Sequence, residues 1–194
     1  PSLEAQLCNL ADEIAYNAHD IDDGVRSGLL TLEQLDDVEM FAACHAEARA
    51  AYPQLDGRRL LFEIIRRMIG RQVDDLIACT GEAIRAAAPP SVDAVRASPP
   101  LVRFSAPMAA RCLHLKQFLR ANLYRHPQVV ETTDRARRVL ADLFAIYSGD
   151  ETTLPPAVVA LPKRHRAIAD YIAGMTDRFA LREHERLTGE TLFP

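Results

Sequence analysis

Residues 2–24 decide the fold, and they read SLEAQLCNLADEIAYNAHDIDDG. At 100° per residue, the large aliphatic side chains of this stretch fall on one side of a helix. They are Leu3, Leu7, Leu10, Ile14 and Ile21. Ser2 is a favourable N-cap ahead of this stripe. The pattern therefore predicts an amphipathic helix from near Ser2 to about Gly24.

The opposite side of this helix is acidic. Its polar side chains fall within an arc of about 100°, and they are Asp12, Tyr16, His19, Asp20 and Asp23. No lysine lies one turn from these acids to pair with them, as a solvated helix would favour. Clustered carboxylates beside a phenol suit a hard cation or a ribose hydroxyl. A solvated helix face is the alternative interpretation.

The rest of the chain also has a helical hydrophobic period, with no convincing alternating strand. Thr31 and Gln34 form a capping-box pattern at the start of a second helix. The expected helices cover residues 31–52, 56–88, 108–124, 133–147 and 163–187, with a short one from residue 91. Prolines and glycines predict a loop over residues 148–162. The sequence predicts an all-α fold, an irregular helical bundle formed by a single region over residues 1–194.

Composition narrows the class of protein. The chain has 194 residues, a net charge of −4 and 48% hydrophobic residues, and no apolar run approaches the ~20 residues of a membrane span. The four cysteines lack the close pairs of a zinc ribbon or redox dithiol. We therefore expect a cytoplasmic protein with no membrane and no strong nucleic-acid partner. The start of the chain lacks the basic and apolar regions of a signal peptide. Because it begins with proline and has no initiator methionine, we also expect that an upstream segment was removed.

Three blocks of the sequence resemble one enzyme family. The first contains LADEIAYN and HDIDDG within residues 10–24, the second is FLRANLYRH at 118–126, and the third is IADYIAGMTDR at 168–178. They resemble the bacterial dGTPase-like deoxynucleoside triphosphate triphosphohydrolases of the HD-domain superfamily, of which this chain would be the C-terminal part. The resemblance implies hydrolysis of a dNTP, such as dGTP, to a deoxynucleoside and tripolyphosphate.

The resemblance also implies roles for residues of the first helix. Asp12 matches a ligand of the divalent metal, Mg²⁺ or Mn²⁺, and Tyr16 and Asp20 match positions that contact the deoxyribose. Glu13 stands where a vertebrate relative has a phosphate-binding lysine, so no phosphate contact carries over to it. His19 and Asp20 form an HD dipeptide, yet the family's metal-binding pair lies far upstream, so we do not expect His19 to be a ligand. One carboxylate does not hold a catalytic divalent ion, so we expect the isolated chain to be inactive.

Weaker signals lie elsewhere. Arg67, and less clearly Arg66, are candidates for the polyphosphate, and solvated arginines are the alternative. Residues 163–166 form a basic run at a helix start, where the helix dipole disfavours it. That cost suggests a contact with an anion, and a solvated surface is the simpler interpretation. Residues 122–126 suggest a subunit interface or a site for a dNTP activator, since several relatives are homo-oligomers. The rival function is a non-catalytic helical module for oligomerisation or nucleotide sensing.

Overall fold

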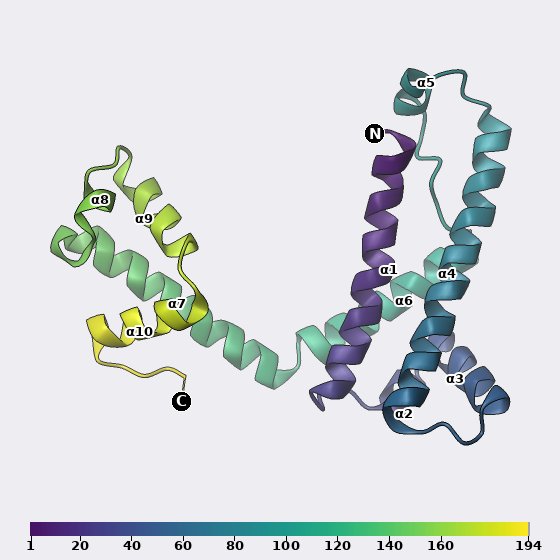
Figure 1. The fold of residues 1–194 in the computed structure, drawn as a ribbon, viewed down its shortest axis with the longest axis horizontal. Helices are drawn as coiled ribbons and strands as arrows, with labels where there is room; N and C mark the ends of the chain where they lie inside the picture. Colours follow the sequence, from purple (N-terminus) through teal and green to yellow (C-terminus); the bar gives the residue numbers. More distant parts are fainter. Residues whose placement is uncertain (194) are drawn as a thin grey trace. The chain divides into compact units, whose positions relative to one another are not determined.

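The computed structural model describes residues 1–193 and contains ten α-helices there (Figure 1). Helices make up the regular structure of this described range, with no strand. The all-α prediction is therefore confirmed. The chain divides into two compact units, residues 1–126 and residues from 127 onward, where the sequence predicted one helical region.

The first unit contains six α-helices and one π-helical turn. The helices are α1 (Leu3–Arg26), α2 (Leu32–Leu35), α3 (Glu39–Ala51), α4 (Gly57–Ala87), α5 (Val92–Ala97) and α6 (Ala106–Leu119). The π-helical turn η1 (Arg120–Tyr124) continues α6. Ser2 accepts a hydrogen bond from the backbone N–H of Ala5, and the capping box of Thr31 and Gln34 forms at α2. The predicted helix over residues 31–52 is nevertheless wrong, because it breaks between α2 and α3 at residues 36–38.

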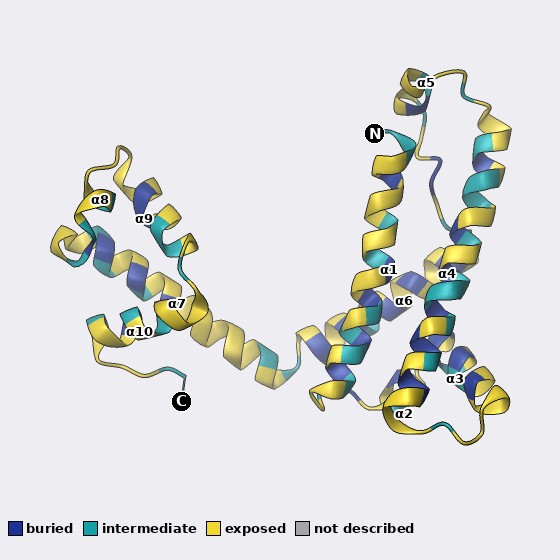
Figure 2. Ribbon diagram, in the orientation of Figure 1, coloured by how far each residue is buried: buried dark blue, intermediate teal, exposed yellow. Residues whose placement is uncertain are grey.

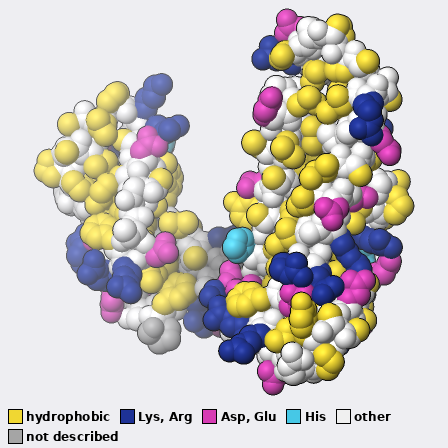
Figure 3. Space-filling view, turned by 45° about the vertical axis from the view of Figure 1, so that its right-hand side comes forward, with side chains coloured by type: hydrophobic (Ala, Val, Ile, Leu, Met, Phe, Trp, Pro, Cys, Tyr) yellow, Lys and Arg dark blue, Asp and Glu magenta, His cyan; other side chains and the backbone are white. Residues whose placement is uncertain are grey.

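The core of the first unit lies where α1, α3, α4 and α6 pack together, as the buried positions in Figure 2 show. Leu35, Phe41, Leu60 and Leu115 are fully buried there. Other apolar side chains of this unit remain exposed, and Figure 3 shows them as a band along one face. The aliphatic stripe of α1 is therefore only partly buried inside the unit, because Ile14 and Ile21 are buried whereas Leu7 is exposed.

Gln6 holds the extended segment before α6 against α1. Its side-chain oxygen accepts hydrogen bonds from the backbone N–H groups of Leu101 and Val102, at 2.8 and 3.1 Å. All three residues are buried.

We expect Gln6→Leu to lower the free energy of unfolding by about 2 kcal/mol, because two buried N–H groups lose their acceptor. Urea denaturation followed by circular dichroism measures the change. Gln54→Leu is the control, since Gln54 is exposed and its replacement should stay within about 0.5 kcal/mol. Equal effects of the two substitutions would contradict the assigned role of Gln6.

The second unit contains four α-helices, α7 (Pro127–Gly149), α8 (Pro156–Val159), α9 (Arg164–Ala173) and α10 (Asp177–Thr188), with a 3₁₀ turn η2 (Glu151–Thr153). The single helix predicted over residues 163–187 is wrong. Thr176 accepts a hydrogen bond from the backbone N–H of Phe179 and so starts a new helix. Gly174 ends α9, and a Cβ atom added there would meet only backbone carbonyls of that same helix.

Polar contacts accompany the core of the second unit. Leu143, Tyr147 and Ile168 are fully buried. The Tyr147 hydroxyl donates to the Glu183 carboxylate at 2.8 Å. Buried His184 lies 2.9 Å from the Asp142 carboxylate through Nε2. Because these polar side chains are hydrogen-bonded to each other, they satisfy each other within the fold, and we assign them a structural role.

The four cysteines are free thiols. Cys44 and Cys112 are buried in the first core, and Cys8 is exposed. Among the helices of residues 1–193, none is long and apolar enough to cross a membrane.

Candidate functional site

The acidic face of α1 opens onto a cavity of about 380 Å³ in the first unit. The polar side chains predicted from the helical period are among those that line it, namely Asp12, Tyr16 and Asp20. Opposite them, α6 contributes Lys116 and Leu119, and η1 contributes Tyr124. The structure therefore brings the three predicted α1 residues together with side chains that come about 100 residues later in the chain.

Tyr124 couples the π-helical turn to α1. Its hydroxyl donates a hydrogen bond to the Asp20 carboxylate. That hydrogen bond, together with burial, raises the pKa of Tyr124 to about 12, so its hydroxyl keeps its proton at neutral pH. The π-helical turn closes through a bond from the backbone N–H of Arg125 to the carbonyl of Arg120 at 3.1 Å. Such turns are frequent at functional sites.

Lys116 is the single cationic side chain in the lining of this cavity. Its ammonium group lies 2.6 Å from the Glu13 carboxylate. The lining thus holds three carboxylates, from Asp12, Glu13 and Asp20, against one ammonium group, which leaves two surplus negative charges. Such a surface attracts cations and repels a free triphosphate. No local pattern in the sequence points to Lys116, because its place in the cavity depends on how α6 packs against α1.

Asn17 lies at the buried edge of the cavity. Its exposed fraction is 7%, and its amide nitrogen has no hydrogen-bond partner among residues 1–193. A buried donor without an acceptor costs about 1–3 kcal/mol. Asn17 lies outside the acidic face of the helix, about 140° from Asp12 and at the boundary with the apolar stripe, so the helical period does not single it out.

The residues of this cavity do not form a metal site by themselves. Asp12 offers an exposed carboxylate, which suits a hard divalent cation. Over residues 1–193, however, no three His, Cys, Asp or Glu side chains come together as a metal-binding group. Asp12 therefore fits as one ligand of a site that needs others.

The other predicted residues lie elsewhere. His19 is exposed and does not line the cavity. Arg66 and Arg67 are on α4, and both donate hydrogen bonds to the Glu63 carboxylate at 2.8 Å. These bonds, above all the one from Arg66, lower the pKa of Glu63 to about 2. Neither arginine lines the cavity. Their assignment to a polyphosphate stays a prediction, and both side chains already share their charge with the Glu63 carboxylate.

Several of the remaining candidate groups have partners inside their own unit, whereas the buried Nδ1 atom of His126 has no hydrogen-bond partner among residues 1–193. Asn122 donates to the carbonyl of Phe118 at 3.0 Å. In the basic run, Arg164 bonds the carbonyl of Ser148 at 2.8 Å, and Arg166 pairs with Asp170. Lys163 has a left-handed backbone with φ 58° at the start of α9.

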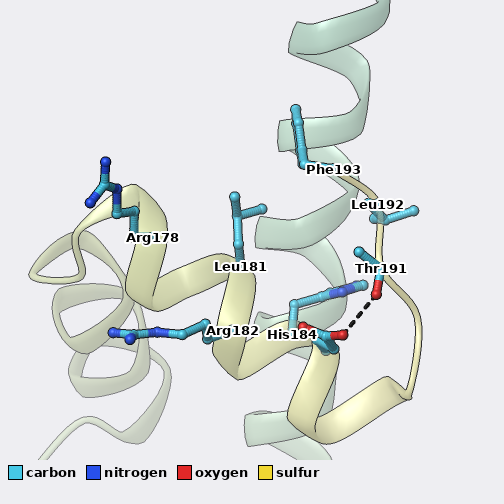
Figure 4. A pocket seen from close by; sticks show the side chains of 8 residues that line it. Arg178, Leu181, Arg182, His184, Thr191, Leu192 and Phe193 are labelled. Atoms are coloured by element: carbon cyan, nitrogen blue, oxygen red, sulfur yellow. Dashed lines mark hydrogen bonds between the residues drawn. The ribbon is translucent and has the colours of Figure 1, made fainter.

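A second hollow, of about 300 Å³, lies beside α10 in the second unit (Figure 4). Leu181, Leu192 and Phe193 are among its lining side chains, and Thr191 bonds Glu185 at 2.8 Å across it. The two arginines of the lining extend away from Leu192 and Phe193 in Figure 4. Since no cationic group converges on this hollow, we assign no site to it.

The fold and the cavity define an all-helical protein with an acidic pocket. Residues 102–186 match the family model described as a phosphohydrolase-associated domain. Over 96% of its length, the chain is 55% identical to a deoxyguanosinetriphosphate triphosphohydrolase-like protein of Ralstonia nicotianae, 54% to one of Bordetella pertussis and 52% to one of Azoarcus. The chain is thus a homologue of the dGTPase-like proteins, and it spans about half of their length, 49–50%.

Proposed function

We propose that this chain contributes part of the active site of an enzyme that hydrolyses a dNTP to a deoxynucleoside and tripolyphosphate. The observation that carries the proposal is the meeting of Asp12, Tyr16 and Asp20 on one cavity. The names of the homologues support the reaction class, because they are dGTP triphosphohydrolase-like proteins.

In this proposal the cavity receives the sugar end of the substrate. Tyr16 is 63% exposed, so its ring is free to pack against a deoxyribose. The Asp20 carboxylate accepts a hydrogen bond from the 3′-hydroxyl, and the Tyr124 hydroxyl holds that carboxylate in place by donating a second hydrogen bond to it. Lys116, the cationic group of the lining, would be the group to meet a phosphate, and it would then share its ammonium group between that phosphate and the Glu13 carboxylate.

Asp12 is proposed as one ligand of a divalent cation, Mg²⁺ or Mn²⁺. When bound, such an ion polarises a phosphoryl oxygen and lowers the pKa of the attacking water. The surplus negative charge of the lining favours a cation and disfavours a free triphosphate. The remaining metal ligands, a dNTP activator and homo-oligomeric assembly belong to the proposal for the whole enzyme.

We expect the purified 194-residue chain to release no tripolyphosphate from dGTP with either Mg²⁺ or Mn²⁺. The reason is that Asp12 alone does not hold a catalytic ion. Ion chromatography of the reaction products measures this, with a sample lacking protein as the control. Release above that control would show that the chain carries a complete metal site.

A non-catalytic module is the second candidate function. One observation favours it for the chain taken alone, namely that residues 1–193 contain no group of three metal-ligating side chains. In that case the cavity would bind a nucleotide without hydrolysing it. Calorimetric binding of a dNTP by the chain, with no turnover in the assembled protein, would support this function.

A further inference from the structure

An open apolar groove of about 810 Å³ separates α1 from the C-terminal half of α4. Its exposed side chains include Ile77, Leu7 and Val73, with exposed fractions of 67, 47 and 37%. Glu4 is the single charged side chain in the lining. Figure 3 shows hydrophobic side chains gathered along one face of the larger unit.

Such a surface is costly to leave in water. Burial of apolar area is favourable, and monomeric proteins rarely expose large contiguous apolar patches without a binding role. The lining runs from Leu3 to Ala15 on α1 and from Ile69 to Ile84 on α4. At 1.5 Å per residue these stretches are about 18 and 22 Å long. A helix of about 12–15 residues with an apolar face fills a groove of that length.

The homologues are about twice as long as the chain. The chain corresponds to 49% of the Ralstonia relative, so about half of that protein lies outside the matched region. We propose that the groove is the docking surface for a helix from this unmatched half of a dGTPase-like protein. A second copy of the chain is the competing occupant, and it would leave the groove of a single full-length protein open.

The groove adjoins the acidic cavity along α1. Ala11 and Ala15 line the groove, whereas their neighbours Asp12 and Tyr16 line the cavity. A polypeptide seated in the groove therefore borders the Asp12 carboxylate. It can supply further metal ligands there, and this last consequence rests on the proposed function.

The test compares the chain alone with a chimera in which it replaces the matched half of the Ralstonia nicotianae relative. Ile77→Asp is the test variant and Leu113→Asp the matched control, since Leu113 is 56% exposed on α6 and lies outside the groove. In the chain alone, neither substitution should change the thermal midpoint appreciably. In the chimera, Ile77→Asp should lower the midpoint by at least about 5 °C while Leu113→Asp leaves it unchanged.

Maleimide labelling gives a second measurement that does not depend on an aspartate being tolerated. Ile77→Cys should react at least tenfold more slowly in the chimera than in the chain alone, and Leu113→Cys at equal rates in both. Peptide mapping separates these sites from the exposed Cys8.

Two results would overturn the proposal. One is equal labelling of Ile77→Cys in the chimera and the chain alone. The other is a dimer of the chain in sedimentation velocity that Ile77→Asp dissolves, which would make a second copy the occupant. dNTP hydrolysis by the chimera is measured separately. A protected groove in a chimera without hydrolysis would sink the proposed function and leave the docking surface intact.

Discussion

In an active enzyme that contains this sequence, Asp12→Ala should reduce dNTP turnover to background, a loss of at least about a thousandfold. The carboxylate is exposed into the acidic cavity, and a lost metal ligand removes several kcal/mol of transition-state stabilisation. Turnover measured by tripolyphosphate release, together with metal content by mass spectrometry, checks this result.

His19→Ala is the matched control for that experiment. His19 belongs to the same helix and to a dipeptide that resembles a metal-binding pair, yet it is exposed and outside the cavity lining. We expect its replacement to leave the metal content at the wild-type level. If His19→Ala strips the metal as fully as Asp12→Ala does, the assignment of Asp12 and the dismissal of His19 are both wrong.

The sequence predicted helix positions correctly where the hydrophobic period and the capping residue agreed. The stripe from Leu3 to Ile21 requires a helix, and Ser2 caps it as predicted. The same reasoning failed at Thr176, where the hydrophobic period continues across the break but a side-chain cap starts a new helix. Periodicity reports which face is apolar, and it does not report where the backbone turns between two helices with the same phase.

The candidate site divides in the same way. Asp12, Tyr16 and Asp20 belong to one helix, so their common face follows from its 3.6-residue period alone. Lys116 and Tyr124 reach that cavity through packing of α6 against α1 and through a π-helical turn. Neither the register of that packing nor the extra backbone residue of the turn leaves a periodic signal. The sequence placed Tyr124 in a motif, and its contact with Asp20 came from the structure.

The apolar stripe of α1 illustrates a further difference between pattern and packing. The pattern predicted a buried face, and Ile14 and Ile21 are buried within the unit. Leu7, on the same stripe, is 47% exposed and lines the groove toward α4. A hydrophobic stripe therefore predicts that a helix face is covered, but it does not identify the element that covers it. The proposed docking experiment tests which element covers the exposed part of this stripe.

The second large effect concerns the sugar. A 2′,3′-dideoxynucleoside triphosphate should be a poor substrate of the wild-type enzyme, with kcat/KM about 10–100-fold below that of the dNTP. The 3′-hydroxyl bonds a charged acceptor in this proposal, and such a bond contributes about 1.5–3 kcal/mol. A carboxylate has about four acceptor positions, so Asp20 can accept from the Tyr124 hydroxyl and the sugar at once.

Asp20→Asn tests this directly, because it keeps the shape of the side chain and removes its charge. We expect Asp20→Asn to use the dNTP poorly, to retain the wild-type metal content and to show a much smaller dideoxy penalty. Tyr124→Phe is the companion variant: it removes the hydroxyl that orients Asp20 but keeps the carboxylate, so most of the dideoxy penalty should remain. Competition kinetics with the two substrates measure the penalty in each variant. An unchanged dideoxy penalty in Asp20→Asn would mean that Asp20 does not bind the 3′-hydroxyl, and the acidic face of α1 beyond Asp12 would then be a solvated surface.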